Sequence, residues 1–284
     1  MMREETTAEC VVLEERAFSI KKRLLAMHLK AHAGHVGSSL SCAELLTLLK
    51  FAWMRGDDSF VLSKGHAATA LYSLLAEVNV LSASQIDSYL EDGTGLPAHP
   101  PFSGIKEIPF ATGSLGHGLS LSAGMALGAR LNGQDRRFFC VTSDGELDEG
   151  SVWEAALFIA HHRLKNLVWI IDRNHLQGIG RTEEVLALEP LAAKLCAFGY
   201  HVVGADGHDF PSLLAARDEC AQALHAHGKP VVLIAQTVKG NGISSLQDTV
   251  DSHYLPMNDE QYAQALDEVT RAHQAALGSH RNAS

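Results

Sequence analysis

The stretch from Arg137 to Gln177, RFFCVTSDGELDEGSVWEAALFIAHHRLKNLVWIIDRNHLQ, decides how this chain folds. The apolar runs 138–141 and 167–171 have the composition of strands that are buried on both faces of a parallel sheet. Between them, apolar residues recur at the spacing of a helix: Trp153, Leu157 and Ala160. A strand, a helix and a strand of this length form a right-handed crossover, so both strands end at the same edge of the sheet.

An oxygen-bearing side chain follows each of these two strands. Asp144 comes just after the first and Asn174 just after the second. Open α/β sheets bind ligands at the carboxyl ends of their strands, so we expect the two residues to be neighbours although they are far apart in sequence. Such oxygens suit Mg²⁺, which prefers octahedral oxygen ligands and often stays bound to a phosphate of a substrate or cofactor. The alternative is an ordinary solvated turn.

Composition excludes several classes of protein. The chain has 284 residues, 46% of them hydrophobic, which is enough for a sizeable core. A formal net charge of −10 without a basic stripe argues against a nucleic-acid partner. The sequence contains no run of eighteen apolar residues, so we expect no membrane span. The N-terminus lacks the apolar segment of a signal peptide. The five cysteines show no CxxC spacing and no disulfide framework, so we expect reduced thiols in a cytoplasmic protein.

Strand and helix patterns alternate along the rest of the chain. Further strands are expected at 60–62, 201–205 and 230–238, with helical patterns between them. Alternation without a break in composition predicts an α/β fold with one doubly wound, mostly parallel sheet and helices on both faces. We expect a single domain over residues 1–284, with a C-terminal helical extension over about 257–284.

Capping patterns predict where four helices begin. In such a pattern a Ser, Thr or Asn is followed three positions later by Glu or Gln. It occurs in the pairs Thr6 with Glu9, Ser41 with Glu44, Ser82 with Gln85, and Asn258 with Gln261. We therefore expect the first helix to start near Thr6 and another helix to run from Ala43 to Trp53.

Two neighbouring loops have the composition of a ligand site. The connection 93–112 is long for a compact domain, which is usual for functional loops. The glycine-rich turn 113–118 then opens a helix of small residues, and the free N–H groups at such a helix start suit an anion.

Together these segments resemble the N-terminal, diphosphate-binding half of transketolase over nearly the whole length. The matching segments occur in the family's order: GHVGSSLSCAELL, FVLSKGHAATALY, LPAHP, ATGSLGHGLSLSAGMALG, SDGELDEGSVWEA, DRNHLQ, DGHD and KGNGI. Val36 replaces a family Pro and Ser143 a Gly. At Ser114 and His117 full-length transketolases often have Pro and Gln, a departure that is typical of shorter relatives.

The resemblance implies a cofactor, thiamine diphosphate, held with Mg²⁺ or Ca²⁺. The metal ligands carried over from the family are Asp144, Asn174 and the carbonyl of Leu176. The residues implied to bind the cofactor are His66, Gly113, Ser114, Leu115, Gly116, Asp144, Gly145, Glu146 and Asn174. Gly145 would let the turn approach the diphosphate without a Cβ in the way.

The resemblance also implies catalytic residues. His35, His99 and His253 would face the reacting carbon and the sugar. Glu149 matches a family glutamate that passes protons between sites near the subunit interface. The alternative for Glu149 is a solvated residue at a helix N-terminus, where a negative charge is favourable.

A partner subunit follows from the same resemblance. The cofactor must be hydrogen-bonded by a carboxylate that, in this family, lies in a second domain on another chain. We expect this chain to form an α2β2 complex with a separate C-terminal, pyrimidine-binding subunit.

The expected activity is that of a transferase, a split transketolase that moves a two-carbon ketol unit from a ketose or ketose phosphate to an aldehyde. The alternatives are the α-subunit of a 2-oxo-acid dehydrogenase and a non-catalytic regulatory subunit of the same fold. LSKGH and the four-histidine set favour a sugar substrate, and the intact Asp144 and Asn174 argue against a regulatory role.

Overall fold

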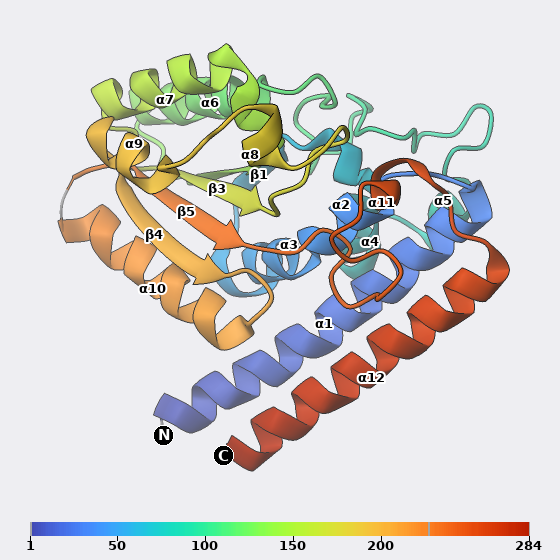
Figure 1. Ribbon diagram of the computed structural model, residues 1–284. Coiled ribbons are helices and arrows are strands. Elements are labelled where there is room, and N and C mark those ends of the chain that lie inside the picture. The colour runs from blue at the N-terminus through green and yellow to red at the C-terminus, as the bar shows by residue number, and fades with distance from the viewer. Residues whose placement is uncertain (1, 227, 284) are drawn as a thin grey trace.

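The computed structural model describes residues 2–226 and 228–283, which form an α/β fold around one five-stranded parallel sheet (Figure 1). The strand order is β1-β2-β3-β5-β4, and all four pairings are parallel. The strands are β1 (Ser59–Leu62), β2 (Phe138–Ser143), β3 (Leu167–Arg173), β4 (His201–Asp206) and β5 (Val231–Gln236). The predicted fold class is confirmed, and each predicted strand is present.

Side chains of the inner strands alternate between two hydrophobic cores, one on each face of the sheet. In β2, Phe139 and Val141 join the larger core, whereas Phe138 and Cys140 join the smaller one. The same alternation occurs in β3 and β5. This two-residue period puts a covering layer of helices on both faces.

The two faces are covered by different helices (Figure 1). The smaller core lies under α6 (Gly118–Leu131), α7 (Gly150–His162) and α9 (Leu191–Ala197). The larger core lies under helices from the start of the chain and under α10 (Phe210–Ala226). Those early helices are α1 (Met2–Ala31), α2 (Val36–Ser41), α3 (Ala43–Leu48) with its π-helical continuation η1 (Leu49–Trp53), and α4 (Ala68–Glu77).

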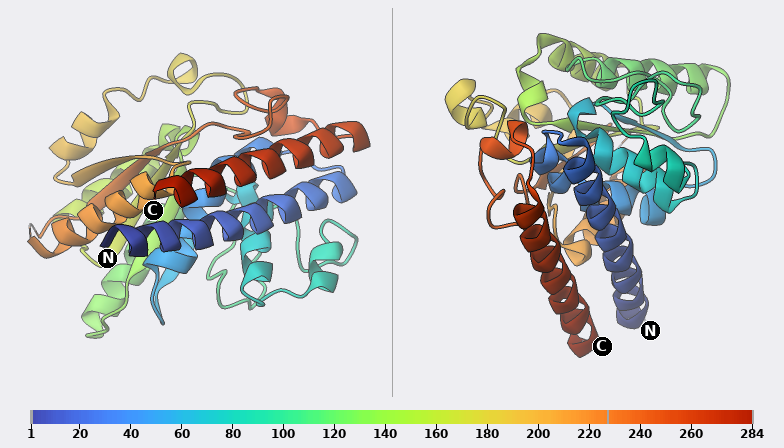
Figure 2. Two further views of the ribbon diagram at one scale, coloured as in Figure 1. Left: turned by 90° about the horizontal axis from the view of Figure 1, so that it is seen from below. Right: turned by 90° about the vertical axis from the view of Figure 1, so that its right-hand side faces the viewer.

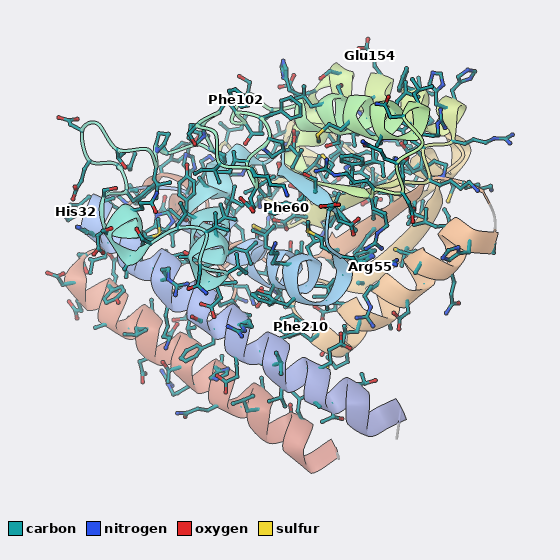
Figure 3. All side chains as sticks on the ribbon, turned by 180° about the vertical axis from the view of Figure 1, so that it is seen from behind. His32, Arg55, Phe60, Phe102, Glu154 and Phe210 are labelled. Carbon is teal, nitrogen blue, oxygen red and sulfur yellow. The ribbon has the colours of Figure 1, made fainter. Side chains whose placement is uncertain are left out.

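Short elements and loops complete the chain. They are the 3-10 turns η2 (Gly65–Ala67) and η3 (Gly145–Asp148), and the helices α5 (Ala83–Asp87), α8 (Thr182–Val185) and α11 (Asp251–Tyr254). The long connection 93–112 is held to α4 by the Tyr72 hydroxyl, which donates to the Pro97 carbonyl over 2.9 Å. At its outer side Phe102 is 75% exposed (Figure 3).

One of the four predicted helix starts is wrong, and a second, at Ala43, is right although its predicted cap is not. Helix α1 already begins at Met2, so Thr6 lies inside it. The N-cap of α3 is Cys42 without a side-chain cap, because Ser41 and Glu44 make contacts with other parts of the fold. The capping box of Ser82 with Gln85 is confirmed. So is the start at Asn258: its side chain accepts from the Gln261 amide, and its own amide donates to the Gln261 side chain.

Helix α7 exists where it was predicted, although only two of the residues that indicated it, Trp153 and Ala160, pack against the core. Leu157 is 54% exposed, and the buried residues are Val152, Ala155, Ala156 and Ile159. The helix carries apolar residues around most of its circumference, so spacing alone does not determine which face packs on the sheet.

The C-terminal helix α12 (Asp259–Ala283) packs along α1. Figure 2 shows the two long helices side by side, extending together beyond the rest of the fold, with their outer ends at the same side. No helix within the described residues is long and apolar enough to cross a membrane. Among these residues Cys196, on α9, is the exposed cysteine, and the other four are buried.

Candidate active site

The carboxyl ends of β2 and β3 form part of the wall of a cavity of about 260 Å³. Ser143 is in register with Asp172, and the Asp144 amide donates to the Asp172 carbonyl over 3.1 Å. Asp144 and Asn174 therefore leave the sheet side by side, and both line the cavity. The prediction that the two residues are spatial neighbours is confirmed.

The cavity brings together most of the residues that the sequence indicated. These are His35, His66, His99, Gly113, Leu115, Asp144, Gly145, Asn174, Leu176 and His253. Four predicted site residues do not line it in the described part of the chain: Ser114, Gly116, Glu146 and Glu149.

Four histidines from separate loops converge at one end of the cavity. The His35 ring centroid is 4.5 Å from that of His253, 5.8 Å from that of His66 and 6.1 Å from that of His99. His35 is held in place by its backbone, because its amide donates to the His253 carbonyl over 2.9 Å. Loops that lie more than two hundred positions apart in sequence thus present their imidazoles to one space.

Burial keeps these imidazoles neutral. It lowers the pKa of His35 to about 4, with further contributions from His99 and Lys239. Burial and then the Lys239 charge lower the pKa of His253 to about 3. The pKa values of His66 and His99 are also lowered by burial. Neutral imidazoles each offer one N–H donor and one acceptor nitrogen, which suits proton exchange with hydroxyl and carbonyl groups.

Lys239 brings a buried positive charge to the same cavity. Its ammonium donates to His253 Nδ1 over 2.9 Å and to the carbonyls of Leu176 and Gln177 over 3.3 and 3.4 Å. Within the described residues no carboxylate forms an ion pair with it. Burial and the nearby Lys64 lower the Lys239 pKa to about 8. An ammonium that faces a cavity without a counter-charge is a favourable site for an anion.

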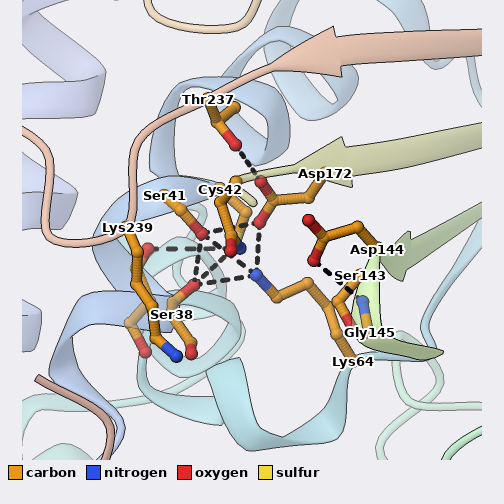
Figure 4. Close-up of polar contacts among 12 residues, drawn as sticks. Ser38, Ser41, Cys42, Lys64, Ser143, Asp144, Gly145, Asp172, Thr237 and Lys239 are labelled. Atoms are coloured by element: carbon orange, nitrogen blue, oxygen red, sulfur yellow. Dashed lines mark hydrogen bonds and ion pairs between the residues drawn. The ribbon is translucent and has the colours of Figure 1, made fainter. Parts of the chain in front are cut away.

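A second buried lysine is, by contrast, fully paired (Figure 4). Lys64 follows β1 and forms an ion pair with Asp172 in which both side chains are 0% exposed. Ser41 donates to Asp172 Oδ2 over 2.6 Å, and Thr237 donates to Oδ1. Lys64 also donates to the Ser38 carbonyl over 3.0 Å. This network joins α2 to the ends of β1, β3 and β5 directly behind the cavity.

The loop 113–118 is shaped from behind by Glu146. This carboxylate is fully buried and accepts hydrogen bonds from the Gly116 amide over 2.9 Å and from the Ser63 hydroxyl. Gly113 has a φ of +136°, and a Cβ there would lie 2.9 Å from His99 Cδ2. The loop therefore needs glycine where the imidazole of His99 packs against it.

Gly145 and Glu149 differ from the other predicted residues in their surroundings. A Cβ on Gly145 would lie 2.9 Å from Gln177 Cγ, so this glycine makes room for a neighbouring side chain. Glu149 is exposed at the N-cap position of α7. The proton-relay role of Glu149 stays a prediction, since that role requires a second site across an interface.

Sequence reasoning did not assign a role to Lys239, Ser38, Gln177 or Gly178, which all line the cavity. A signal for Lys239 was present: KGNGI follows the most apolar strand of the chain at the same sheet edge as Asp144 and Asn174. Applying the strand-end argument to β5 as well would have included this lysine.

The fold and the cavity define an α/β enzyme with neutral histidines, oxygen-bearing side chains and an unpaired ammonium at one strand edge. Comparison with known proteins agrees with this. Residues 15–273 match the family described as transketolase, thiamine diphosphate binding domain. The chain is 37% identical to the 6-deoxy-6-sulfo-D-fructose transketolase subunit SqwG of Clostridium sp. (strain MSTE9), over 91% of this chain and 96% of the relative.

Further comparisons extend this. The chain is 38% identical to an apulose-4-phosphate transketolase subunit of Phocaeicola vulgatus, over 91% of this chain and 94% of the relative. The transketolase structure from Campylobacter jejuni superimposes with a TM-score of 0.83 at 25% identity, covering 96% of this chain and 46% of that one. The chain belongs to the transketolase family, as the N-terminal subunit of a split, thiamine diphosphate-dependent enzyme. These findings favour the transketolase interpretation over the 2-oxo-acid dehydrogenase alternative.

Proposed function

We propose that this subunit binds thiamine diphosphate and Mg²⁺ in the 260 Å³ cavity and, with a pyrimidine-binding partner in an α2β2 complex, transfers a two-carbon ketol unit from a ketose to an aldehyde. Two relatives are named for a sulfonated and a phosphorylated sugar. Both names describe sugars with an anionic group, which supports a donor ketose of that kind. The free thiols fit a reducing compartment such as the cytoplasm.

The donor atoms at the cavity fit a divalent cation. Asp144 Oδ1, Asn174 Oδ1 and the Leu176 carbonyl are the hard oxygens that Mg²⁺ or Ca²⁺ prefers. Among the described residues each accepts a single hydrogen bond, from the Gly145 amide, the Leu176 amide and the Lys239 ammonium respectively. All three residues line the cavity. These residues would hold the metal against the diphosphate.

The single observation that carries the proposal is the buried, unpaired ammonium of Lys239 beside those oxygens. A diphosphate would supply its counter-charge, and Gly113 and Leu115 of the loop 113–118 line the same cavity. When bound, thiamine diphosphate supplies the nucleophilic ring carbon and the electron sink for breaking a carbon–carbon bond.

The histidines would exchange protons with the sugar. His35 Nδ1 is buried without a hydrogen-bond partner among the described residues, which leaves it for a ligand. His253 Nδ1 accepts from Lys239, so the neutral ring carries its proton on Nε2 and can donate from there. An unpaired nitrogen on one ring and a donor on the adjacent ring suit a substrate that gains and loses hydroxyl protons.

The test is cofactor binding by the assembled enzyme. Thiamine diphosphate with Mg²⁺ should raise the melting temperature, since a ligand at a hundred times its Kd adds roughly 2.7 kcal/mol. Asp144→Ala should abolish the shift, and EDTA should abolish it in the unmodified enzyme. Asp206→Ala is the matched control, because Asp206 also ends a strand at this edge but is exposed. An undiminished shift in Asp144→Ala would place the metal site elsewhere.

A further inference from the structure

Arg173 is the last residue of β3 and stands directly before the proposed metal ligand Asn174. Its side chain is 1% exposed, and Nη1 donates to Asp144 Oδ2 over 3.0 Å. Its other terminal nitrogen binds Glu183 Oε1 at 2.5 Å and Glu189 Oε1 at 3.2 Å. The spacing of Asp144 and Asn174 does not require an arginine at position 173. The role of this buried cation beside the proposed metal ligand Asp144 therefore has to be explained by its contacts.

The two oxygens of Asp144 have very different surroundings. Oδ2 accepts three hydrogen bonds, from Arg173 Nη1, from the His175 amide at 2.6 Å and from the Thr182 hydroxyl at 3.1 Å. Within the described part of the chain, Oδ1 accepts only the Gly145 amide, at 2.8 Å (Figure 4). A carboxylate oxygen has about two lone-pair sites, so Oδ2 is saturated and Oδ1 is not.

The donors to Oδ2 are themselves fixed. Glu183 and Glu189, which hold Arg173, also accept backbone amides of the segment 188–191. The segment 182–191 therefore supports the guanidinium, and the guanidinium in turn fixes the rotation of the Asp144 carboxylate. Outer hydrogen-bond partners of this kind set the orientation of a metal-binding group.

From this geometry we infer that Arg173 is a positioning residue that presents Asp144 to the metal through Oδ1 alone. The inference rests on the proposed function. Single-oxygen coordination suits Mg²⁺, which requires near-ideal octahedral geometry. Ca²⁺ takes more ligands and often binds both oxygens of a carboxylate. Arg173, with Thr182, thus biases the site against Ca²⁺ relative to Mg²⁺.

The test compares the two ions in the holoenzyme. Half-saturating Mg²⁺ and Ca²⁺ concentrations for thiamine diphosphate binding are measured by calorimetry in the unmodified enzyme, in Arg173→Met and in Arg173→Met with Thr182→Ala. Removing the positive charge of Arg173 should strengthen the binding of both cations alike. The informative quantity is therefore the ratio of the half-saturating Mg²⁺ concentration to the half-saturating Ca²⁺ concentration. We expect the half-saturating concentration of Ca²⁺ to fall relative to that of Mg²⁺ in the single variant and to fall further in the double variant. The total change should be about tenfold, the lower end of the effects typical of residues that hydrogen-bond to a metal ligand.

Two further variants complete the design. Arg173→Lys keeps a donor to Oδ2 and should leave the ratio within about threefold of the unmodified value. If the Arg173→Met variants do not fold, Thr182→Ala alone replaces them, because it also removes a donor to Oδ2 and should by itself move the ratio toward Ca²⁺; an unchanged ratio in that variant then overturns the inference. Arg137→Met removes another arginine–aspartate pair, with Asp58, at the opposite end of the sheet and should leave the ratio unchanged. An unchanged ratio in the double variant overturns the inference. Absence of any metal-dependent binding in the unmodified enzyme overturns the proposed site itself.

Discussion

We propose two different tasks for three of the four cavity histidines. His66 lies in the turn after β1, close to Lys64, whereas His35 and His253 form the closest pair of rings among the four. We assign His66 to the cofactor and the other two to the sugar. Because His35 adopts a left-handed backbone with φ of 70°, asparagine is a better replacement than alanine at this position.

The first prediction separates cofactor binding from substrate chemistry. His66→Ala should weaken thiamine diphosphate binding, measured by fluorescence titration. His35→Asn and His253→Ala should bind the cofactor nearly normally and lose about 10²–10⁴-fold in kcat/KM, the usual size of a proton-transfer role. Since their rings are in contact, the double variant should lose less than the product of the single losses.

The matched control is His32→Asn. His32 is exposed and also has a left-handed backbone, with φ of 46°, three residues before His35. Its replacement should change neither quantity. Loss of cofactor binding in His35→Asn and His253→Ala, together with normal binding in His66→Ala, would reverse the proposed orientation of the cavity.

At the scale of the elements, buried polar contacts behind the cavity hold the strand ends together. Lys64, Asp172 and Thr237 come from three different strand ends, and Ser41 joins them from α2. Removing one partner of a buried ion pair leaves the other charge uncompensated, which is far more costly than losing an exposed pair.

The second prediction follows from that network. Asp172→Asn should lower the free energy of unfolding by about 3–5 kcal/mol, because the Lys64 ammonium stays buried without a counter-charge. Asp267→Asn breaks the exposed pair with Arg271 and should cost at most about 0.5 kcal/mol. Urea unfolding of the assembled protein measures both. Equal effects of the two substitutions would contradict the structural role of the network.

Local sequence patterns predicted the elements well and the buried polar contacts poorly. Alternating strands and helices gave the fold class, and the strand-end argument placed Asp144 beside Asn174. The pattern of Ser41 with Glu44 looked like a helix cap, yet Ser41 binds Asp172 and Glu44 binds Lys21 and His208. Nothing local distinguishes these uses, because the partners are supplied by the tertiary fold.

The same limit applies to residues behind the site. Glu146 was expected at the cofactor, and the structure places its carboxylate on the backbone of the loop 113–118 instead of on the cavity. No role was predicted for Arg173 from the sequence, since an arginine at the end of a strand is usually solvated. Both roles depend on contacts with segments at least ten residues away.

At the scale of the whole molecule, the third prediction concerns assembly. The subunits of split transketolases that resemble this chain match it over nearly their whole length. The isolated chain should show no ketol transfer from a ketose phosphate, and addition of its partner should restore the activity. Light scattering should then show two copies of each chain. Robust turnover by the isolated chain, with contaminating transketolase excluded, would refute this expectation.

The exposed thiol on α9 gives a practical means of observing that assembly. Maleimide dyes react with accessible thiols, and the other four cysteines are buried. A single dye should therefore attach at Cys196, and none of the other cysteines needs to be mutated. The same helix and the residue after it contribute Lys194, Ala197 and Phe198 to an apolar groove that also includes Trp153 and Leu186. A fluorophore at this position would therefore report, in real time, whether the groove becomes covered when a second protein is added.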